Sequence, residues 1–245
     1  MDFLKALYRT FLCFRDVHFN PFSFLSSIPS FLKAFLKQKK NKTFQTSFRF
    51  LYPIFSDRTK NTPLEPTYFF QNTWCASMIF NHKPKSHYDV GSHALLVGIL
   101  SQFVPVTMVD IRPIKLQLDN LSFLEGSILN LPFTDSSIES LSSICVIEHI
   151  GLGRYGDPID AFGSEKAAQE LSRVLRPGGN LYISLPVDSE NRIYFNAHRA
   201  FTRESVLKLF NSLTLVEEKY IYGDNLVDSY NPQKGFGTGL FYFKK

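Results

Sequence analysis

The stretch Tyr88-Asp89-Val90-Gly91-Ser92 decides the fold of this 245-residue chain. Residues 88–90 predict a short strand, and the glycine that follows marks a turn at its end. Residues 93–103 then carry apolar side chains at helical spacing, and residues 106–110 predict a second strand. A strand, a glycine turn, a helix and another strand predict two parallel strands joined by a crossover.

The same alternation continues to the end of the chain. Further strands are expected at five places: 123–125, within 138–147, 181–185, 216–222 and 239–243. Helices are expected at 67–81, 164–175 and 202–213, and Arg176-Pro177-Gly178-Gly179 should end the second of these and turn the chain. This order predicts an α/β fold of Rossmann type, a mostly parallel sheet with helices on both faces. Because no helical pattern separates the last two strands, the final strand should be antiparallel.

The first 60 residues differ in composition from the remainder. They hold 11 Lys/Arg against three Asp, a net charge of +8, and 12 of the 25 phenylalanines. The net charge of residues 61–245 is −3. The overall charge of +5 therefore says little about what this larger part of the chain binds. We therefore expect two domains, a basic Phe-rich helical arm over 1–60 and an α/β domain over 61–245.

Two helices are expected in the arm. Apolar residues recur at helical spacing over 3–12, Asn20-Pro21 breaks the chain, and Pro29 suits the first turn of a second helix that reaches Leu36. The favoured interpretation is that these helices pack on the larger domain or on a partner subunit. The alternative is peripheral contact of residues 1–42 with an anionic membrane, which would place the protein at the inner face of that membrane. Nucleic-acid binding is disfavoured, because a basic stretch alone is weak evidence for it.

Cysteine content and hydropathy exclude several classes of protein. The three cysteines, Cys13, Cys75 and Cys145, are too few and too far apart for a disulfide framework or a CxxC zinc site, and no His/Asp spacing matches a metal-ligand set. No apolar run reaches about 18 residues without a charge, and no secretory signal is recognisable at the start. We expect a cytoplasmic protein without a metal site. The oligomeric state is left open.

Candidate binding residues follow the first three predicted strands, because ligands of open α/β sheets bind at the carboxyl ends of the strands. Asp89, Gly91 and Ser92 form the first turn. Asp110 ends the second strand 19 residues after Gly91, where a carboxylate can accept the hydroxyls of a ribose. Ser127 and Ile128 follow the third strand and are placed to border an adenine. The alternative is that Asp89 and Asp110 merely cap helices or turns.

The segment 148–160 after the fourth strand holds the densest group of reactive side chains. Glu148, His149, Arg154, Tyr155 and Asp157 lie there among three glycines. His149 is a candidate base, with Glu148 beside it, and Arg154 is a candidate ligand for an anionic substrate, with Tyr155 and Asp157 near it. The structural alternatives are a turn capped by Glu148 and an ion pair between Arg154 and Asp157.

A second cluster follows the fifth strand. Asn196 and Arg199 are candidate substrate ligands, and His198 is a second candidate base. The carboxyl ends of parallel strands meet at one edge of the sheet, so the two clusters should face each other. A buried, hydrogen-bonded structural role is the alternative for His198.

Several motifs follow one another as in class I S-adenosylmethionine-dependent methyltransferases. They are Asp89-Val90-Gly91, Asp110, Leu131-Pro132-Phe133 before Asp135, and Leu175-Arg176-Pro177-Gly178-Gly179. The chain also resembles the DUF268 family over residues 66–243. The stretches that carry this likeness are 87–92, 109–113, 147–160 and 195–199, and Glu148-His149-Ile150-Gly151-Leu152-Gly153-Arg154-Tyr155-Gly156-Asp157-Pro158 is the most specific.

The resemblance implies a seven-stranded sheet with an antiparallel last strand and S-adenosylmethionine lying over strands one and two. It assigns Asp89 and Gly91 to the start of the cofactor loop, Asp110 to the ribose, and Glu148 and His149 to the region of catalytic or substrate contacts. Ser127 stands where many relatives carry an acid beside the adenine. His93 and Leu95 replace the second and third glycines of the usual loop, and a side chain there could block the methionine part of the cofactor.

Three functions are therefore weighed. The first is a methyltransferase acting on a small-molecule or glycan-like acceptor. The second is a non-catalytic, methyltransferase-like binding domain with a degenerate cofactor loop. The third, a nicotinamide-dependent enzyme, is disfavoured because the same glycines are missing.

Overall fold

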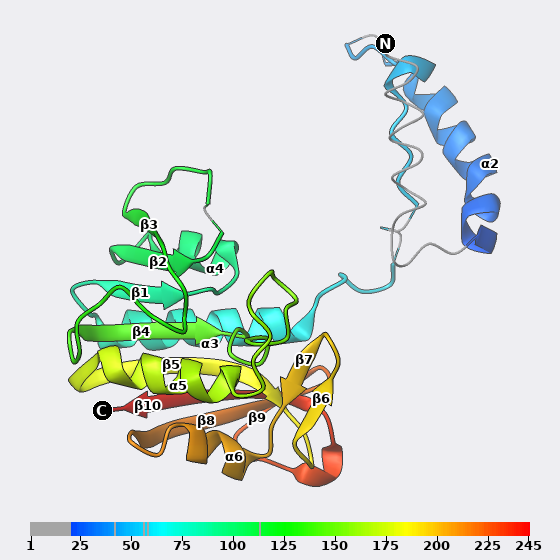
Figure 1. Ribbon diagram of the computed structural model, residues 1–245. Coiled ribbons are helices and arrows are strands. Elements are labelled where there is room, and N and C mark those ends of the chain that lie inside the picture. The colour runs from blue at the N-terminus through cyan, green and yellow to red at the C-terminus, as the bar shows by residue number, and fades with distance from the viewer. Residues whose placement is uncertain (1–20, 42, 56, 58, 113) are drawn as a thin grey trace. The chain divides into compact units, whose positions relative to one another are not determined.

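The computed structural model describes residues 21–245 apart from 42, 56, 58 and 113 (Figure 1). The helix expected over residues 3–12 lies outside these residues. The chain divides into two compact units, a first unit that ends at Leu64 and a second unit from Glu65 to Lys245. None of the described helices is long and apolar enough to cross a membrane.

The described residues of the first unit form a long helix, α2 (Pro21–Gln38), and a short 3-10 helix, η1 (Phe48–Phe50). The expectation that this helix begins at Pro29 is wrong, because Pro29 lies inside α2. Both prolines suit a first turn, where the missing N–H costs nothing, and it is Pro21 that takes this position. The helix continues past Pro29, and the Ser30 hydroxyl donates to the Ser27 carbonyl at 2.8 Å.

The second unit is built on one eight-stranded sheet in the order β3-β2-β1-β4-β5-β10-β8-β9. Its strands are β1 (His87–Val90), β2 (Val106–Asp110), β3 (Leu121–Glu125), β4 (Ile138–Ile144), β5 (Leu175–Val187), β8 (Thr214–Tyr222), β9 (Asn225–Val227) and β10 (Gly237–Lys244). The first five strands are parallel to one another, and β10 is antiparallel to both β5 and β8. The antiparallel final strand is thus confirmed.

The expected number of strands, seven, is corrected to eight. The additional strand β9 is only three residues long and pairs back onto β8 through a tight turn. A separate hairpin of β6 (Arg192–Tyr194) and β7 (His198–Ala200) was also not expected. Segments this short carry too few residues to show an alternating pattern.

Helices cover both faces of the sheet, as predicted (Figure 1). On one face lie α3 (Pro66–His82) and α4 (Ala94–Leu100), whose apolar side chains join one buried cluster. On the other face lie α5 (Gly163–Val174) and α6 (Arg203–Leu209), which join a second cluster. Alternate residues of β10 enter the two clusters, because successive side chains of a strand point to opposite faces. The last helix of the second unit is η2 (Pro232–Lys234).

The Arg176–Gly179 segment ends α5 as expected but does not leave the sheet. It lies within the bounds of β5, where Ile138 pairs with Leu175 and Ser140 with Asn180. The register shift absorbs the extra residues as a bulge, and Gly178 adopts a φ of +76°.

Strand β1 occupies the point where the chain order reverses. β2 and β3 lie on one side of it, and β4 and β5 lie on the other. Loops that leave β1 and β4 therefore separate at the carboxyl edge, the position at which open α/β sheets bind ligands.

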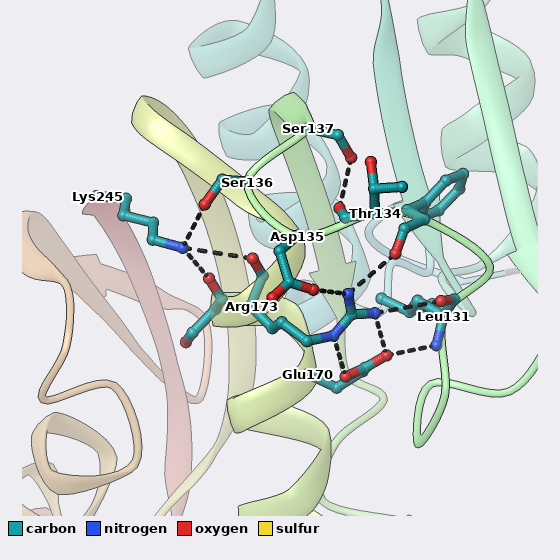
Figure 2. Close-up of polar contacts among 10 residues, drawn as sticks. Leu131, Thr134, Asp135, Ser136, Ser137, Glu170, Arg173 and Lys245 are labelled. Carbon is teal, nitrogen blue, oxygen red and sulfur yellow. Dashed lines mark hydrogen bonds and ion pairs between the residues drawn. The ribbon is translucent and has the colours of Figure 1, made fainter.

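The segment between β3 and β4 is fastened to α5 by a polar cluster, which Figure 2 shows. Arg173 pairs with Glu170 and with Asp135, both at 2.6 Å, and donates to the Phe133 and Leu131 carbonyls. Glu170 in turn accepts the Leu131 N–H at 2.6 Å. These contacts hold the chain that runs from the end of β3 to the start of β4.

We predict that Arg173→Met lowers the free energy of unfolding by about 1–3 kcal/mol, because it leaves carbonyl acceptors in this segment without their donor. Arg176→Met is the matched control. Arg176 is half-exposed and pairs with Glu139, so its loss should cost about 0–1 kcal/mol. Urea denaturation of the two variants checks this, and equal costs would contradict the assigned role of Arg173.

Candidate functional site

Asp89 joins β1 to β4 at the reversal point. Its buried carboxylate accepts the Ser92 N–H at 3.0 Å, the Ser92 hydroxyl at 2.6 Å and the Ser142 hydroxyl. The Ser92 hydroxyl accepts the Ile144 N–H at 2.9 Å, which completes the link across the two strands. Burial raises the pKa of Asp89 to about 6, although the serine hydrogen bonds oppose this. Asp89 and Ser92 are thus structural parts of the loop after β1, because their side chains bond to each other and to β4.

Gly91 makes the turn that follows. Its φ is +73°, a left-handed conformation that side chains rarely adopt, and a Cβ there would lie 3.0 Å from Val146 Cγ1. The close approach to Val146 brings the loops after β1 and β4 together.

A cavity of about 440 Å³ lies across the carboxyl ends of the first four strands. It is lined by residues 90–91, 109–112, 126–129, 145–146, 149–150 and 155–158. A second hollow of about 370 Å³ adjoins it and is bounded by Tyr68 of α3 and by residues 91–94. Their common lining consists of Gly91, Asp110, Arg112, Cys145, His149 and Tyr155. We call these two hollows together the switch-point cleft.

Asp110, Ser127 and Ile128 all line the larger hollow of this cleft. Asp110 accepts the Arg112 N–H at 2.8 Å and Arg112 Nε at 3.4 Å, and both contacts use Oδ1. The Ser127 hydroxyl accepts the Leu129 N–H at 3.2 Å, and Ile128 is buried. The structure brings together the three residues expected at a nucleoside.

Tyr155 lines both hollows of the cleft. The guanidinium carbons of Arg112 and Arg154 lie 4.7 and 5.1 Å from the centre of its ring, and His149 meets it edge-on at 5.4 Å. Arg154 also donates to the Ala197 carbonyl at 2.8 Å. Within the described chain Arg154 forms no ion pair, so the alternative pairing with Asp157 is not observed.

Glu148 lies beneath the cleft in a buried polar cluster. Its side chain is 1% exposed, and its Oε2 has no hydrogen-bond partner among the described residues. Oε1 lies 3.6 Å from His149 Nε2, and the Cys145 thiol interacts with the carboxyl group. Burial raises the pKa of Glu148 to about 8, so that the acid is largely protonated at neutral pH.

Cys145 connects Glu148 to helix α3. Its thiol donates to Gln71 Oε1 at 3.0 Å and lies 3.3 Å from the Ser184 hydroxyl, which also donates to Gln71. Burial raises the pKa of the Cys145 thiol, so it remains neutral. Because Cys145 lines both hollows, this cluster supports the floor of the cleft.

The two candidate bases approach each other from different segments. The ring centres of His149 and His198 are 6.4 Å apart, and His149 Nδ1 lies 2.7 Å from the Ala197 carbonyl. Burial lowers the pKa of His149 to about 4, with Arg154 and His198 adding to the effect, and burial and Arg154 lower the pKa of His198. Both imidazoles are therefore neutral at physiological pH, and each keeps one ring nitrogen with a lone pair.

Of three further expected substrate ligands, Asp157 lines the larger hollow, whereas Arg199 and Asn196 line neither hollow. Asp157 accepts the Gly151 N–H at 2.6 Å and the Tyr155 N–H at 3.3 Å, and so shapes the loop. Arg199 is buried and donates to the Ile150 carbonyl at 2.6 Å and to the Asp160 carbonyl at 3.2 Å. Asn196 lies in the exposed turn between β6 and β7. The guanidinium of Arg199 therefore fixes the 148–160 segment by binding two of its backbone carbonyls.

The two side chains that replace glycines differ in position. Leu95 is 70% exposed and lines neither hollow. His93 lines the smaller hollow, caps α4 by accepting the Leu95 N–H at 3.3 Å and packs edge-on against Tyr68 at 5.6 Å. Of the two expected obstructions, only His93 borders the cleft.

Sequence reasoning missed Tyr68, Gln71 and Cys145. Tyr68 and Gln71 lie on α3, which precedes the first strand, and no strand-end rule points to a helix there. The one available signal was Gln71, a polar residue within a helix that packs against the core. Cys145 has a φ of +54° directly after β4, and this conformation is not visible in the sequence. No group of His, Cys, Asp and Glu among the described residues could hold a metal ion.

Residues 129–223 match the profile of a family described as "Caenorhabditis protein of unknown function, DUF268". This matched region covers 95 of the 245 residues. It contains the 148–160 segment, the β6–β7 hairpin and Arg173, but not Asp89, Gly91 or Asp110. The matched range is narrower than the expected 66–243. No curated protein sequence matches the chain.

Solved structures of methyltransferases share the fold. One is the N-methyltransferase NodS from Bradyrhizobium japonicum WM9 in complex with S-adenosyl-L-homocysteine, with 14% identity, a TM-score of 0.53 and coverage of 87% of this chain and 97% of that one. Another is 1,6-didemethyltoxoflavin-N1-methyltransferase from Burkholderia thailandensis with 1,6-didemethyltoxoflavin and S-adenosylhomocysteine bound, with 14% identity, a TM-score of 0.50 and coverage of 76% and 93%. At this identity the likeness shows the fold alone.

The raised pKa of Glu148 predicts a pH dependence of stability. A carboxyl group whose folded pKa exceeds its unfolded value stabilises the fold fully at low pH, and this contribution is lost as the pH rises through the folded pKa. Between about pH 5 and about pH 8, wild type should therefore lose more stability than Glu148→Gln, whose amide does not ionise. Urea midpoints at both pH values measure the difference.

The same charge change at the exposed Glu190, in Glu190→Gln, is the control and should leave the decline as in wild type. An equal decline in wild type and Glu148→Gln would show that the Glu148 carboxyl ionises in the folded chain as it does in the unfolded one.

Proposed function

We propose that this chain is an S-adenosylmethionine-dependent methyltransferase that acts on a small-molecule or glycan-like acceptor in the cytoplasm. The observation that carries the proposal is the switch-point cleft, whose two hollows share Asp110, His149 and Tyr155 in their lining. A volume of about 440 Å³ for the larger hollow is within the range of roughly 300–1,000 Å³ typical of ligand pockets. The methyltransferase fold of the neighbouring structures supports the assignment by analogy.

The residues present fit the cofactor. Asp110 Oδ1 is used by Arg112, so Oδ2 is the oxygen that would accept a ribose hydroxyl. Ile128 would offer an apolar surface to the adenine, and Ser127 a hydroxyl beside it. Gly91 would allow the backbone to approach the ligand closely, within the loop that Asp89 and Ser92 hold in place. When bound, S-adenosylmethionine would supply an electrophilic methyl group.

The chain's own side chains would handle the acceptor. His149 or His198, both neutral, would take the proton that the acceptor hydroxyl or amine releases as it gains the methyl group. Arg154 forms no ion pair in the described chain and would attract an anionic group. The rings of Tyr194, His198 and Phe236 lie 5.3–5.7 Å from one another beside His149, and a sugar or an aromatic group could stack on them.

A non-catalytic binding domain is the second candidate, and His93 is the observation that favours it. This imidazole stands where the usual loop has a glycine, and it borders the smaller hollow. A domain of this kind would bind a nucleoside or sugar without transferring a methyl group.

Calorimetry with S-adenosylmethionine and S-adenosylhomocysteine tests the cofactor assignment. Asp110→Ala should weaken binding by about 10- to 100-fold, because a hydrogen bond to a charged group contributes roughly 1.5–3 kcal/mol. Asp119→Ala, an exposed carboxylate outside both hollows, should bind as wild type does. His149→Ala should still bind S-adenosylhomocysteine if its role is in the transfer step.

An absence of heat and of thermal shift with both ligands would contradict the proposal. Binding that Asp110→Ala leaves unchanged would contradict the placement of the ribose. Binding of both ligands without methylation of any acceptor in a metabolite screen would favour the non-catalytic domain.

A further inference from the structure

Helix α2 presents a stripe of leucines to solvent. Leu25, Leu32 and Leu36 are 63%, 43% and 59% exposed. They are seven and eleven residues apart along the helix, so at about 100° per residue they share one face within roughly 40°. An exposed apolar stripe of this kind marks an interaction surface.

The stripe is not the face that the first unit uses for its own packing. Phe35 is buried, and its ring lies 4.8 Å from that of Phe48, while the ring of Phe31 lies 5.4 Å from that of Phe55. Phe31 and Phe35 are displaced from the leucines by about 100° around the helix. Within the first unit the phenylalanine face is occupied and the leucine face is exposed.

Positive charge lies on one side of the stripe and beyond the end of the helix. Residues 21–55 contain six Lys/Arg and no Asp or Glu. Lys33 and Lys37 lie about 80–120° from the leucines on the side opposite the phenylalanines, and Lys39 and Lys40 follow the end of the helix. Exposed apolar side chains continue beyond the helix at Phe44, Phe50, Tyr52 and Ile54.

We propose that the first unit binds the surface of an anionic membrane, with the leucine stripe of α2 entering the interface and its lysines contacting the lipid headgroups. A helix with an apolar stripe, flanking lysines and no acidic residue has the chemistry of helices that lie in a bilayer interface. Each basic residue near such a surface adds roughly 1 kcal/mol, about fivefold in binding.

Other partners fit these observations less well. Lysines are depleted at the centres of protein–protein interfaces, whereas here Lys33 and Lys37 occupy the helix face next to the leucine stripe. A nucleic acid would use the lysines but would leave the leucines exposed to water. A bilayer interface accommodates both, because long basic side chains reach the headgroups while apolar side chains enter the acyl region.

Flotation of the full chain with vesicles tests the proposal. The chain should float with phosphatidylcholine vesicles that contain phosphatidylserine, and much less with pure phosphatidylcholine or at high salt. Replacing Leu25, Leu32 and Leu36 by serine should reduce the partition coefficient at least about tenfold. The control replaces three exposed aliphatic residues of the second unit, Ile99, Leu116 and Val216, by serine and should partition as wild type does.

A second variant keeps the test valid if the leucine replacements disturb α2. Lys33→Glu with Lys37→Glu leaves the stripe intact and should lose binding to anionic vesicles at least about tenfold. Equal flotation of wild type and both variants would overturn the proposal. A leucine variant that instead becomes less stable in the second unit, or that dissociates from dimer to monomer, would also overturn it, because the stripe would then pack on protein.

Discussion

The hydrogen bonds of the Asp89 carboxylate are the interaction on which the candidate site depends. They tie the loop after β1 to the Ser142 hydroxyl of β4, and Ser92 extends the link to the Ile144 backbone. A buried carboxyl with a pKa near 6 is tolerated here because three donors satisfy it. Since β1 and β4 flank the reversal of strand order, this junction fixes the loops after β1 and β4, which line the switch-point cleft.

The buried polar side chains beneath the cleft are uncharged. Glu148 and Cys145 are held in their neutral forms by burial, and His149 is deprotonated for the same reason. The guanidinium groups of Arg112 and Arg154 are positively charged, and both lie beside the ring of Tyr155. Such an arrangement suits a reaction in which a neutral base accepts one proton and the substrate is held by its negative charge.

The sequence predicted the large elements of the second unit well. Strands β1, β2, β4 and β5 and helices α3 and α5 have strong period-two, continuous apolar or period-3.6 patterns, and the chain order alone indicated a parallel sheet. Short elements were missed, because β9 and the β6–β7 hairpin have three residues per strand. The start of α2 was misplaced because Pro21 and Pro29 offer the same helix-initiating signal.

The candidate site was predicted unevenly for a physical reason. The rules that place ligands at the carboxyl ends of parallel strands located Asp110, Ser127, His149 and Tyr155, because the sheet topology itself brings these residues together. Those rules cannot tell whether a charged side chain faces a cavity or binds backbone carbonyls, and Arg199 does the latter.

A crystal structure of the full chain with S-adenosylhomocysteine tests the central claim most directly. The account predicts the adenosine across the ends of β1 and β2, with the ribose hydroxyls on Asp110 and the adenine beside Ile128. A separate cavity of about 1050 Å³ is lined by residues of α5, α6 and the β6–β7 hairpin. Ligand bound in that cavity, or a switch-point cleft closed by His93 and Tyr155 with no ligand in it, would contradict the account.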